Sequence, residues 1–312
     1  MVAISLVIPV YNEADRLGVN FEKIREQIGQ TGESFEFIFI DDGSTDETWS
    51  YLKTLSRNHN EVFAHRLSRN FGKESAVAAG LSVARGDAVI VMDSDLEHPP
   101  ELIGKMIHIW REGHAQIVEG VKESRTPEGP LKRMLTKGYF FLFNALTGFD
   151  IAQATDYKLL DRSVLDSWAK LSERGVFFRG LVPWLGFRRV ALPFHVGTRE
   201  SGGSRFTYRK LFGLSLQSLI SFSALPLYLI PVCGVLFMLF ALVIGTISIS
   251  QWMQGIAVEG FTTVIILQLF IGGTLLLGLG IIGLYLSQLY EEVKGRPRFI
   301  IAESTQEQKH SQ

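Results

Sequence analysis

The chain has 312 residues, of which 46% are hydrophobic and 20% charged, and its formal net charge is -1. The mean hydropathy of +0.18 is higher than a purely soluble enzyme needs, and the near-neutral charge excludes the broad positive field that recruits nucleic acid, so we expect no nucleic-acid partner. The single Cys233 excludes an internal disulfide, and the seven His lack the paired spacing of a zinc site.

The N-terminal segment predicts a first strand rather than a secretory signal. Residues 1–12 have no basic start, and Pro9 interrupts their apolar stretch. We therefore interpret them as part of the mature protein.

Apolar runs alternate with amphipathic stretches through about the first 200 residues. The expected strands cover residues 4–10, 35–40, 62–67 and 88–92. The expected helices cover residues 17–28, 45–55 and 74–84, and a further helix is opened by Pro99 and Pro100. This alternation predicts an α/β domain with a mostly parallel sheet and helices on both faces.

Polar clusters follow three of these strands, at the edge where open parallel sheets bind ligands. They are Tyr11-Asn12-Glu13, Asp41-Asp42-Gly43-Ser44 and Asp93-Ser94-Asp95. Carboxylates at i and i+2 of an extended chain face the same side, so Asp93 and Asp95 can hold a divalent cation against a diphosphate. The alternative is a turn in which these side chains only satisfy loop backbone groups. We predict that the three clusters converge.

Two long segments, residues 211–258 and 260–290, contain no charged residue. About 20 apolar residues at a rise of ~1.5 Å cross a hydrocarbon core of ~30 Å, so we predict transmembrane helices near residues 224–249 and 262–286. Buried helices of a soluble protein are the alternative. The glycines of the second segment suit close helix contact and leave a homo-oligomer open; they are Gly272, Gly273, Gly278, Gly280 and Gly283.

Basic residues flank the outer ends of both segments, whereas the connecting residues 251–259 contain no Lys or Arg. The flanking residues are Arg205, Arg209 and Lys210 before the first segment and Lys294, Arg296 and Arg298 after the second. This asymmetry predicts an integral protein of the inner membrane with both termini and the sheet domain in the cytoplasm.

We expect four regions: a catalytic domain at residues 1–200, a juxtamembrane linker at 201–223, two transmembrane helices within 224–290 and a tail at 291–312. The polar residues after Ile301 predict a frayed end. Residues 131–146 place Lys132, Arg133 and Lys137 among apolar side chains. They predict either an amphipathic helix on the bilayer surface or an ordinary helix packed on the sheet.

Taken in order and spacing, three motifs resemble those of the family 2 glycosyltransferases. They run over residues 7–13, 41–46 and 93–100. Within that family the chain is most similar to the polyprenyl-phosphate glycosyltransferases, the dolichyl-phosphate mannosyltransferase relatives and especially the bactoprenol glucosyltransferase type with two C-terminal spans. The resemblance extends to about Phe299.

The resemblance implies a GT-A fold and an inverting transfer of one sugar from a UDP-sugar donor to undecaprenyl phosphate at the bilayer, with Mg2+ or Mn2+ as cofactor. Glucose is the expected sugar. Mannose from a GDP donor, N-acetylglucosamine, galactose and an aminoarabinose derivative stay open, because hydroxyl stereochemistry is read by a few pocket residues that no periodicity reveals.

The resemblance assigns nucleotide and metal binding to the three clusters. Pro9, Tyr11, Glu13 and Asp42 seat the nucleotide, and Asp93 and Asp95 handle the metal and diphosphate. Glu13 and Asp42 can accept hydrogen bonds from a uracil or ribose, and Tyr11 can offer its ring to the base. Asp41 or Asp42 with Ser44 can also cap the helix beginning near Thr45, and both roles can hold at once.

Glu97 stands where many relatives carry Gln. It either completes the metal shell or is a helix-start acid favoured by the helix dipole.

The acceptor phosphate requires cations. The resemblance places lipid-phosphate binding at Arg125 and Thr136, where the usual hydroxyl residue is Ser, and Lys132 and Arg133 lie close by in the sequence. A solvated charge run is the alternative.

Asp156 matches a family acid near the reacting sugar and is, with Asp95, our catalytic candidate. It either orients a sugar hydroxyl or balances charge, because a phosphate acceptor needs little general-base help. Later elements resemble segments that close over the substrates; they contain Arg179, Arg199, Ser204 and Arg205, with Arg205 where relatives often have Lys. Gly202 and Gly203 allow such a loop to move.

Two other functions fit parts of the pattern. A processive polysaccharide synthase shares the nucleotide-binding half, but we find neither its Gln-x-x-Arg-Trp element nor its additional spans. A membrane scaffold with a decayed catalytic half conflicts with the acids retained at all three strand ends.

Overall fold

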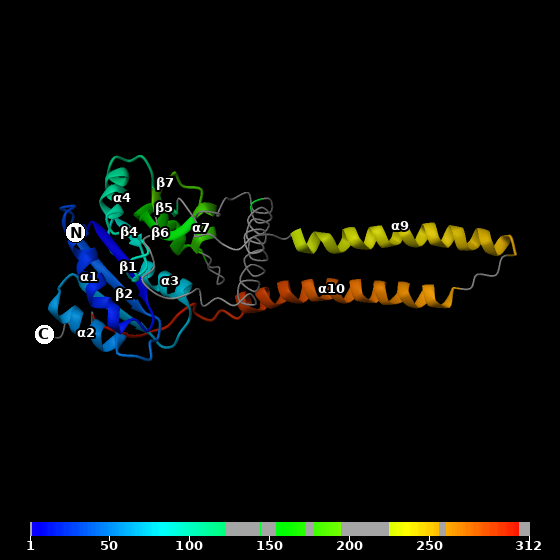
Figure 1. The fold of residues 1–312 in the computed structure, drawn as a ribbon, viewed down its shortest axis with the longest axis horizontal. Helices are drawn as coiled ribbons and strands as arrows, with labels where there is room; N and C mark the ends of the chain where they lie inside the picture. The colour runs from blue at the N-terminus through cyan, green and yellow to red at the C-terminus, as the bar shows by residue number, and fades with distance from the viewer. Residues whose placement is uncertain are drawn as a thin grey trace. The chain divides into compact units, whose positions relative to one another are not determined.

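The computed structural model describes residues 2–122, 144, 154–171, 178–194, 225–255 and 260–305. The chain divides into two compact units, Met1–Phe206 together with Pro297–Gln312, and Thr207–Arg296. Figure 1 shows the first unit as a sheet covered by helices and the second as a pair of long helices.

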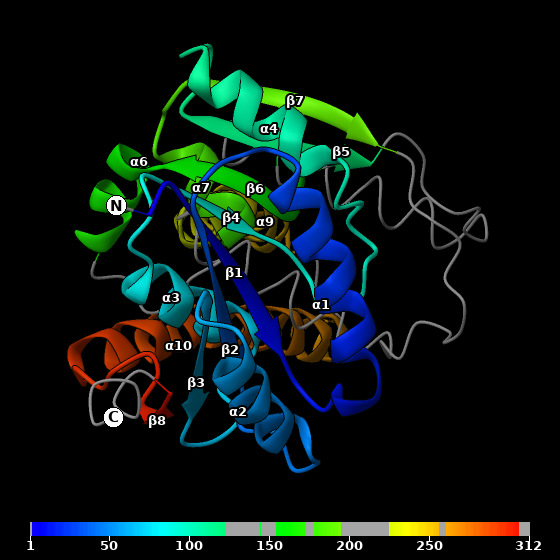
Figure 2. The same cartoon turned by 90° about the vertical axis from the view of Figure 1, so that its left-hand side faces the viewer.

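An eight-stranded sheet forms the first unit, in the order β7-β5-β6-β4-β1-β2-β3-β8, which Figure 2 shows from top to bottom. The strands are β1 (Ile4–Val10), β2 (Phe35–Asp41), β3 (Val62–Leu67), β4 (Ala88–Val91), β5 (Ile117–Lys122), β6 (Ala154–Asp161), β7 (Arg189–Phe194) and β8 (Ile301–Ser304). Strands β4, β1, β2 and β3 are mutually parallel, β7 is parallel to β5, and β6 is antiparallel to both β4 and β5. This mostly parallel, mixed sheet confirms the predicted α/β class and is GT-A-like.

Helices cover both faces of the sheet. They are α1 (Ala14–Gly29), α2 (Thr48–Asn58), α3 (Lys73–Val83), α4 (Leu102–Arg111), α6 (Arg162–Ala169) and α7 (Phe178–Trp184). Side chains alternate between the faces of a strand, so Leu6 and Ile8 share one core with apolar residues of α1, α2 and α4. Val7 faces α3, where a Cβ on Gly80 would lie 2.2 Å from Val7 Cγ1. The small residues of α3 therefore let it lie close against β1.

The second unit contains α9 (Leu225–Met253) and α10 (Phe261–Val293), which run side by side in Figure 1. By length and composition, Leu227–Gln251 and Val264–Val293 are candidate membrane spans, with mean hydropathies of 2.7 and 2.3. Phe237 and Phe270 join the helices edge to face, with ring centroids 5.4 Å apart. If a Cβ were added to each of the five glycines named above, only the one on Gly278 would lie within 4 Å of a neighbour among the described residues. That neighbour is the Ile230 side chain.

Residues 302–305 were expected to belong to a frayed end but are ordered, and the rest of that end, residues 306–312, lies outside the described part of the chain. Strand β8 pairs antiparallel with β3, and Trp49 Nε1 donates to Glu303 Oε2 over 2.9 Å. Thr305 Oγ1 accepts from the Ala64 N–H and from Ser56 Oγ, each over 3.0 Å. This C-terminal segment therefore belongs to the sheet and covers the edge of β3 that would otherwise be open.

Replacing Thr305 by Val should destabilise the folded protein. Valine fills a similar volume but leaves the buried Ala64 N–H without the Thr305 acceptor, a loss worth about 1–3 kcal/mol. We expect a lower thermal unfolding midpoint for the detergent-solubilised full chain. The exposed Thr54→Val on α2 is the matched control, and equal midpoints for the two variants would contradict the role given to Thr305.

Candidate functional site

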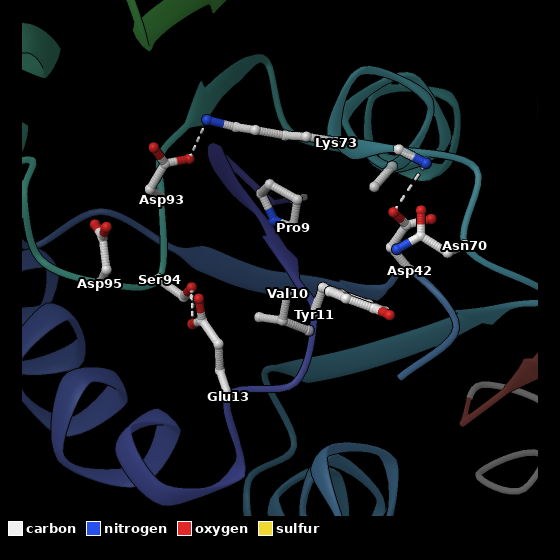
Figure 3. Close-up of a pocket in the computed structure, with 12 residues that line it drawn as sticks. Pro9, Val10, Tyr11, Glu13, Asp42, Asn70, Lys73, Asp93, Ser94 and Asp95 are labelled. Carbon is white, nitrogen blue, oxygen red and sulfur yellow. Dashed lines mark hydrogen bonds and ion pairs between the residues drawn. The ribbon is translucent and has the colours of Figure 1, made fainter. Parts of the chain in front are cut away.

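A cavity of about 330 Å³ opens at the carboxyl ends of β1, β2 and β4 (Figure 3). It is lined by Pro9, Val10, Tyr11, Glu13, Asp42, Asn70, Gly72, Lys73, Ala76, Asp93, Ser94 and Asp95. The predicted convergence of the three polar clusters is confirmed. Because β4 ends at Val91, Asp93 and Asp95 reach the cavity from a turn rather than from the extended strand we expected.

Hydrogen bonds tie the first cluster to the other two. The Asn12 N–H donates to Ser44 Oγ, and the Thr45 N–H donates to Asn12 Oδ1, both over 2.9 Å. Ser94 Oγ donates to Glu13 Oε2, and Asn20 Nδ2 donates to the Ser94 carbonyl over 2.6 Å. These hydrogen bonds therefore hold the three loops that carry the acids against one another.

Asp42 binds the segment that follows β3. Its two carboxylate oxygens accept the N–H groups of Phe71 and Gly72, over 2.7 and 2.9 Å. The alternative that Asp41 or Asp42 caps the next helix is wrong, because α2 begins at Thr48 and the Thr48 N–H donates to Asp46. Asp41 instead accepts the Ser44 N–H over 2.9 Å. Burial raises the pKa of Asp42 despite these donors.

Burial also raises the pKa of Glu13, and the charges of Asp95 and Asp93 add to the shift. These groups repel one another across the cavity, so Glu13 ionises less readily than a free carboxyl group. An added cation on this side of the cavity would relieve the repulsion.

His98 supports the loop that carries the acids. Its Nδ1 accepts the Asp93 N–H over 3.2 Å, and its ring stacks on Tyr157 with centroids 4.9 Å apart. The Glu97 N–H donates to Asp95 Oδ1 over 3.0 Å. Hydrogen bonds within this loop therefore hold Asp93 and Asp95 in place.

An ion cluster joins the loop after β4 to the start of β6. Lys73 Nζ lies 2.6 Å from Asp93 Oδ1 and 2.6 Å from Asp156 Oδ2. Arg179 holds Asp156 from α7, with Nε 2.7 Å and Nη2 2.9 Å from its two oxygens. Burial alone would raise the pKa of Asp156, but these cations hold it well below its ordinary value. Asp156 is therefore a buried, permanently ionised carboxylate.

The chemistry of the lining suits a divalent cation that is shared with a substrate. Four of its charged side chains are acids and one, Lys73, is basic, so the lining would repel a diphosphate without a further positive charge. Among the described residues, no three His, Cys, Asp or Glu side chains gather as a closed metal site. Two carboxylates completed by substrate phosphate oxygens are a usual arrangement for Mg2+. Asp93 and Asp95 fit that arrangement.

Glu97 lies 3.4 Å from Lys122 Nζ and is not among the residues that line the cavity. Its coordination of a metal stays a prediction.

Two polar residues that line the cavity, Asn70 and Lys73, and the neighbouring Glu74 were not predicted from the sequence. A signal was present, since Arg69 and Asn70 form a polar run just after the strand at residues 62–67, at the same edge as the other clusters. Several predicted residues lie outside the described part of the chain: Arg125, Lys132, Arg133, Thr136, Arg199, Ser204 and Arg205. The predicted surface helix at 131–146 lies there too, apart from Asn144.

Comparison with known proteins agrees with this site. The profile of glycosyl transferase family 2 matches residues 5–168, which include every residue that lines the cavity. The chain belongs to this family and is a glycosyltransferase.

Relatives match over nearly the whole chain. A prophage-derived bactoprenol glucosyl transferase of Shigella flexneri is 35% identical over 303 residues, covering 96% of this chain and 98% of that protein. An uncharacterized glycosyltransferase of Synechocystis is 36% identical over 304 residues, covering 97% and 95%. The solved glucosyl-3-phosphoglycerate synthase of Mycobacterium tuberculosis is 19% identical with a TM-score of 0.49, covering 70% of this chain and 76% of that chain. That last likeness is too distant to bear on ligands.

Glu74 connects the site to α7, and its ionisation makes the stability of the folded protein depend on pH. Its Oε2 accepts the Phe178 N–H over 2.9 Å, and burial, with Asp156 adding, raises its pKa from 4.5 to about 7. Ionising Glu74 is thus harder in the folded than in the unfolded chain, so the wild type loses stability as pH rises from 4.5 through about 7.

Glu74→Gln should therefore stabilise the protein at pH 8 by about 2–3 kcal/mol, and the gain should vanish near pH 4, because Gln keeps the acceptor without the charge. Denaturant unfolding of the full chain in detergent at both pH values measures this. Glu26→Gln, exposed on α1, is the control. A variant less stable than wild type at pH 8 would contradict the assignment.

Proposed function

We propose that this protein transfers a single sugar, glucose in the first instance, from a UDP-sugar to undecaprenyl or a related polyprenyl phosphate, with inversion at the anomeric carbon. The observation that carries the proposal is the acid-lined cavity at the sheet edge, with the ionised Asp156 beside it. The Shigella flexneri relative, named a bactoprenol glucosyl transferase, supports both the sugar and the lipid acceptor.

The proposed reaction is one displacement. A phosphate oxygen of the acceptor attacks the anomeric carbon while the bond from that carbon to the UDP oxygen breaks, so UDP leaves with the electron pair. Mg2+ or Mn2+, when bound at Asp93 and Asp95, supplies positive charge that offsets the charge developing on UDP. Pro9, Tyr11, Glu13 and Asp42 line the cavity and would hold the nucleoside.

Asp156 acts on the sugar without taking a proton. Both of its oxygens are engaged by cations, and its lowered pKa makes it a weak base. The attacking phosphate is already an anion, so the displacement needs no general base. This favours the interpretation that Asp156 orients a sugar hydroxyl or balances charge.

The acceptor side of the proposal lies outside the described residues. Arg125, Lys132, Arg133 and Thr136 would bind the lipid phosphate, and Arg199, Ser204 and Arg205 would close over the substrates together with Arg179. Guanidinium groups suit this task because they bind phosphate through two parallel hydrogen bonds.

We place the site at the cytoplasmic face of the inner membrane. The basic residues flanking the two candidate spans support this side. The connectivity supports one common side for both ends of the helical pair, because β8 follows α10 in sequence and pairs with β3, so both ends continue into the sheet unit. A site on that side meets nucleotide sugars where they are made.

The direct test uses the purified full chain in detergent with undecaprenyl phosphate, Mg2+ and radiolabelled UDP-glucose. We expect label to enter the lipid fraction and UDP to be released in equal amount. A parallel screen of other UDP- and GDP-sugars identifies the donor. If none transfers its sugar to the lipid, the proposed function is wrong.

Asp95→Ala should reduce this transfer at least about 100-fold, because Asp95 would hold the cation that offsets the leaving-group charge, and loss of such stabilisation costs about 2.7–4 kcal/mol in related cases. The measurement is the initial rate of lipid labelling at saturating donor. Asp166→Ala, exposed on α6, should leave the rate unchanged. A rate near wild type for Asp95→Ala would remove this carboxylate from the site.

A further inference from the structure

The ammonium group of Lys73 is shared between two acids with different tasks. It lies 2.6 Å from Asp93, assigned to the metal and diphosphate, and 2.6 Å from Asp156, assigned to the sugar. Figure 3 shows the Lys73 side chain reaching across the cavity from the start of α3 to Asp93. The single positive charge of Lys73 therefore offsets part of the negative charge of both carboxylates.

The two acids differ in how much they depend on Lys73 for a positive partner. The Lys73 side chain is 41% exposed and the Asp156 side chain only 6%. Arg179 already binds both oxygens of Asp156. Asp156 thus keeps Arg179 as an ionic partner when Lys73 turns away. Asp93 does not, because among the described Lys and Arg side chains only Lys73 lies within 4 Å of it.

A divalent cation on Asp93 would lie next to this ammonium group. Like charges at such distances repel, and the repulsion is large where water is partly excluded. A bound diphosphate changes the balance because its oxygens attract both cations at once. Lys73 lines the cavity and can turn toward such oxygens.

We infer that Lys73 is a positioning residue that makes binding of the divalent cation depend on the donor diphosphate. Lys73 weakens binding of the cation to Asp93 when no diphosphate is present, and it strengthens binding of the cation and the diphosphate together. This inference rests on the proposed function for the identity of the diphosphate. Reciprocity requires that the cation strengthen diphosphate binding by the same factor. The enzyme would then hold its metal mainly when donor is present.

The test measures Mn2+ binding to the full chain in detergent by electron paramagnetic resonance, with and without UDP. We expect Lys73→Met and Lys73→Gln to bind Mn2+ alone at least about tenfold more tightly than wild type. Their affinity for UDP in the presence of Mn2+ should fall, so the factor by which UDP tightens Mn2+ shrinks. Lys73→Arg keeps the charge and should retain weak binding of Mn2+ alone.

Lys105→Met, exposed on α4, is the matched control for loss of a lysine and should not change Mn2+ affinity. Neutral variants at position 73 that bind Mn2+ alone no more tightly than wild type overturn the inference. Wild-type protein that binds Mn2+ equally well with and without bound UDP overturns it as well, even if the variants do not fold. Absence of UDP binding to any form would instead count against the proposed donor, because the measurement with Mn2+ alone involves no nucleotide.

Discussion

Repulsion among carboxylates governs the chemistry of the cavity at the sheet edge. Glu13, Asp42, Asp93 and Asp95 line one cavity, and their crowding is stable only where cations or backbone N–H groups compensate them. The fold provides N–H donors for Asp42 and an ammonium group for Asp93, while Asp156 receives two cations. Glu13 and Asp95 keep less compensation from the protein, which is why this edge suits a ligand that arrives with positive charge.

Strand direction explains how acids from distant parts of the sequence meet. Asp42, Asp93 and Asp95 follow the ends of parallel strands, so the sheet brings them to one edge. Asp156 lies near the start of its strand and reaches the same edge only because β6 runs antiparallel to β4, with Lys158 opposite Val91. A parallel β6 would have placed Asp156 at the far edge, away from Lys73.

Part of the fold and of the site can be predicted from the sequence, and part depends on tertiary contacts. Apolar runs identified the strands of the parallel half, and strand ends identified the three acidic clusters, because both depend on local pattern. Lys73 and Glu74 were missed because their partners, Asp93, Asp156 and Phe178, are set by tertiary contacts. Strand β8 was missed because a short polar strand on a sheet edge is held by main-chain pairing, which leaves no hydrophobic period to read.

The return of the chain to the sheet matters for the proposed reaction. A polyprenyl acceptor is confined to the bilayer, so an enzyme held at the surface meets it at a high effective concentration. Here the two candidate spans lie in the sequence between two parts of the sheet unit, since Met1–Phe206 and Pro297–Gln312 both belong to it. Two covalent connections restrict the sheet more than a single tether does. Pairing of β8 with β3 thus stabilises the sheet and also anchors the second connection in it.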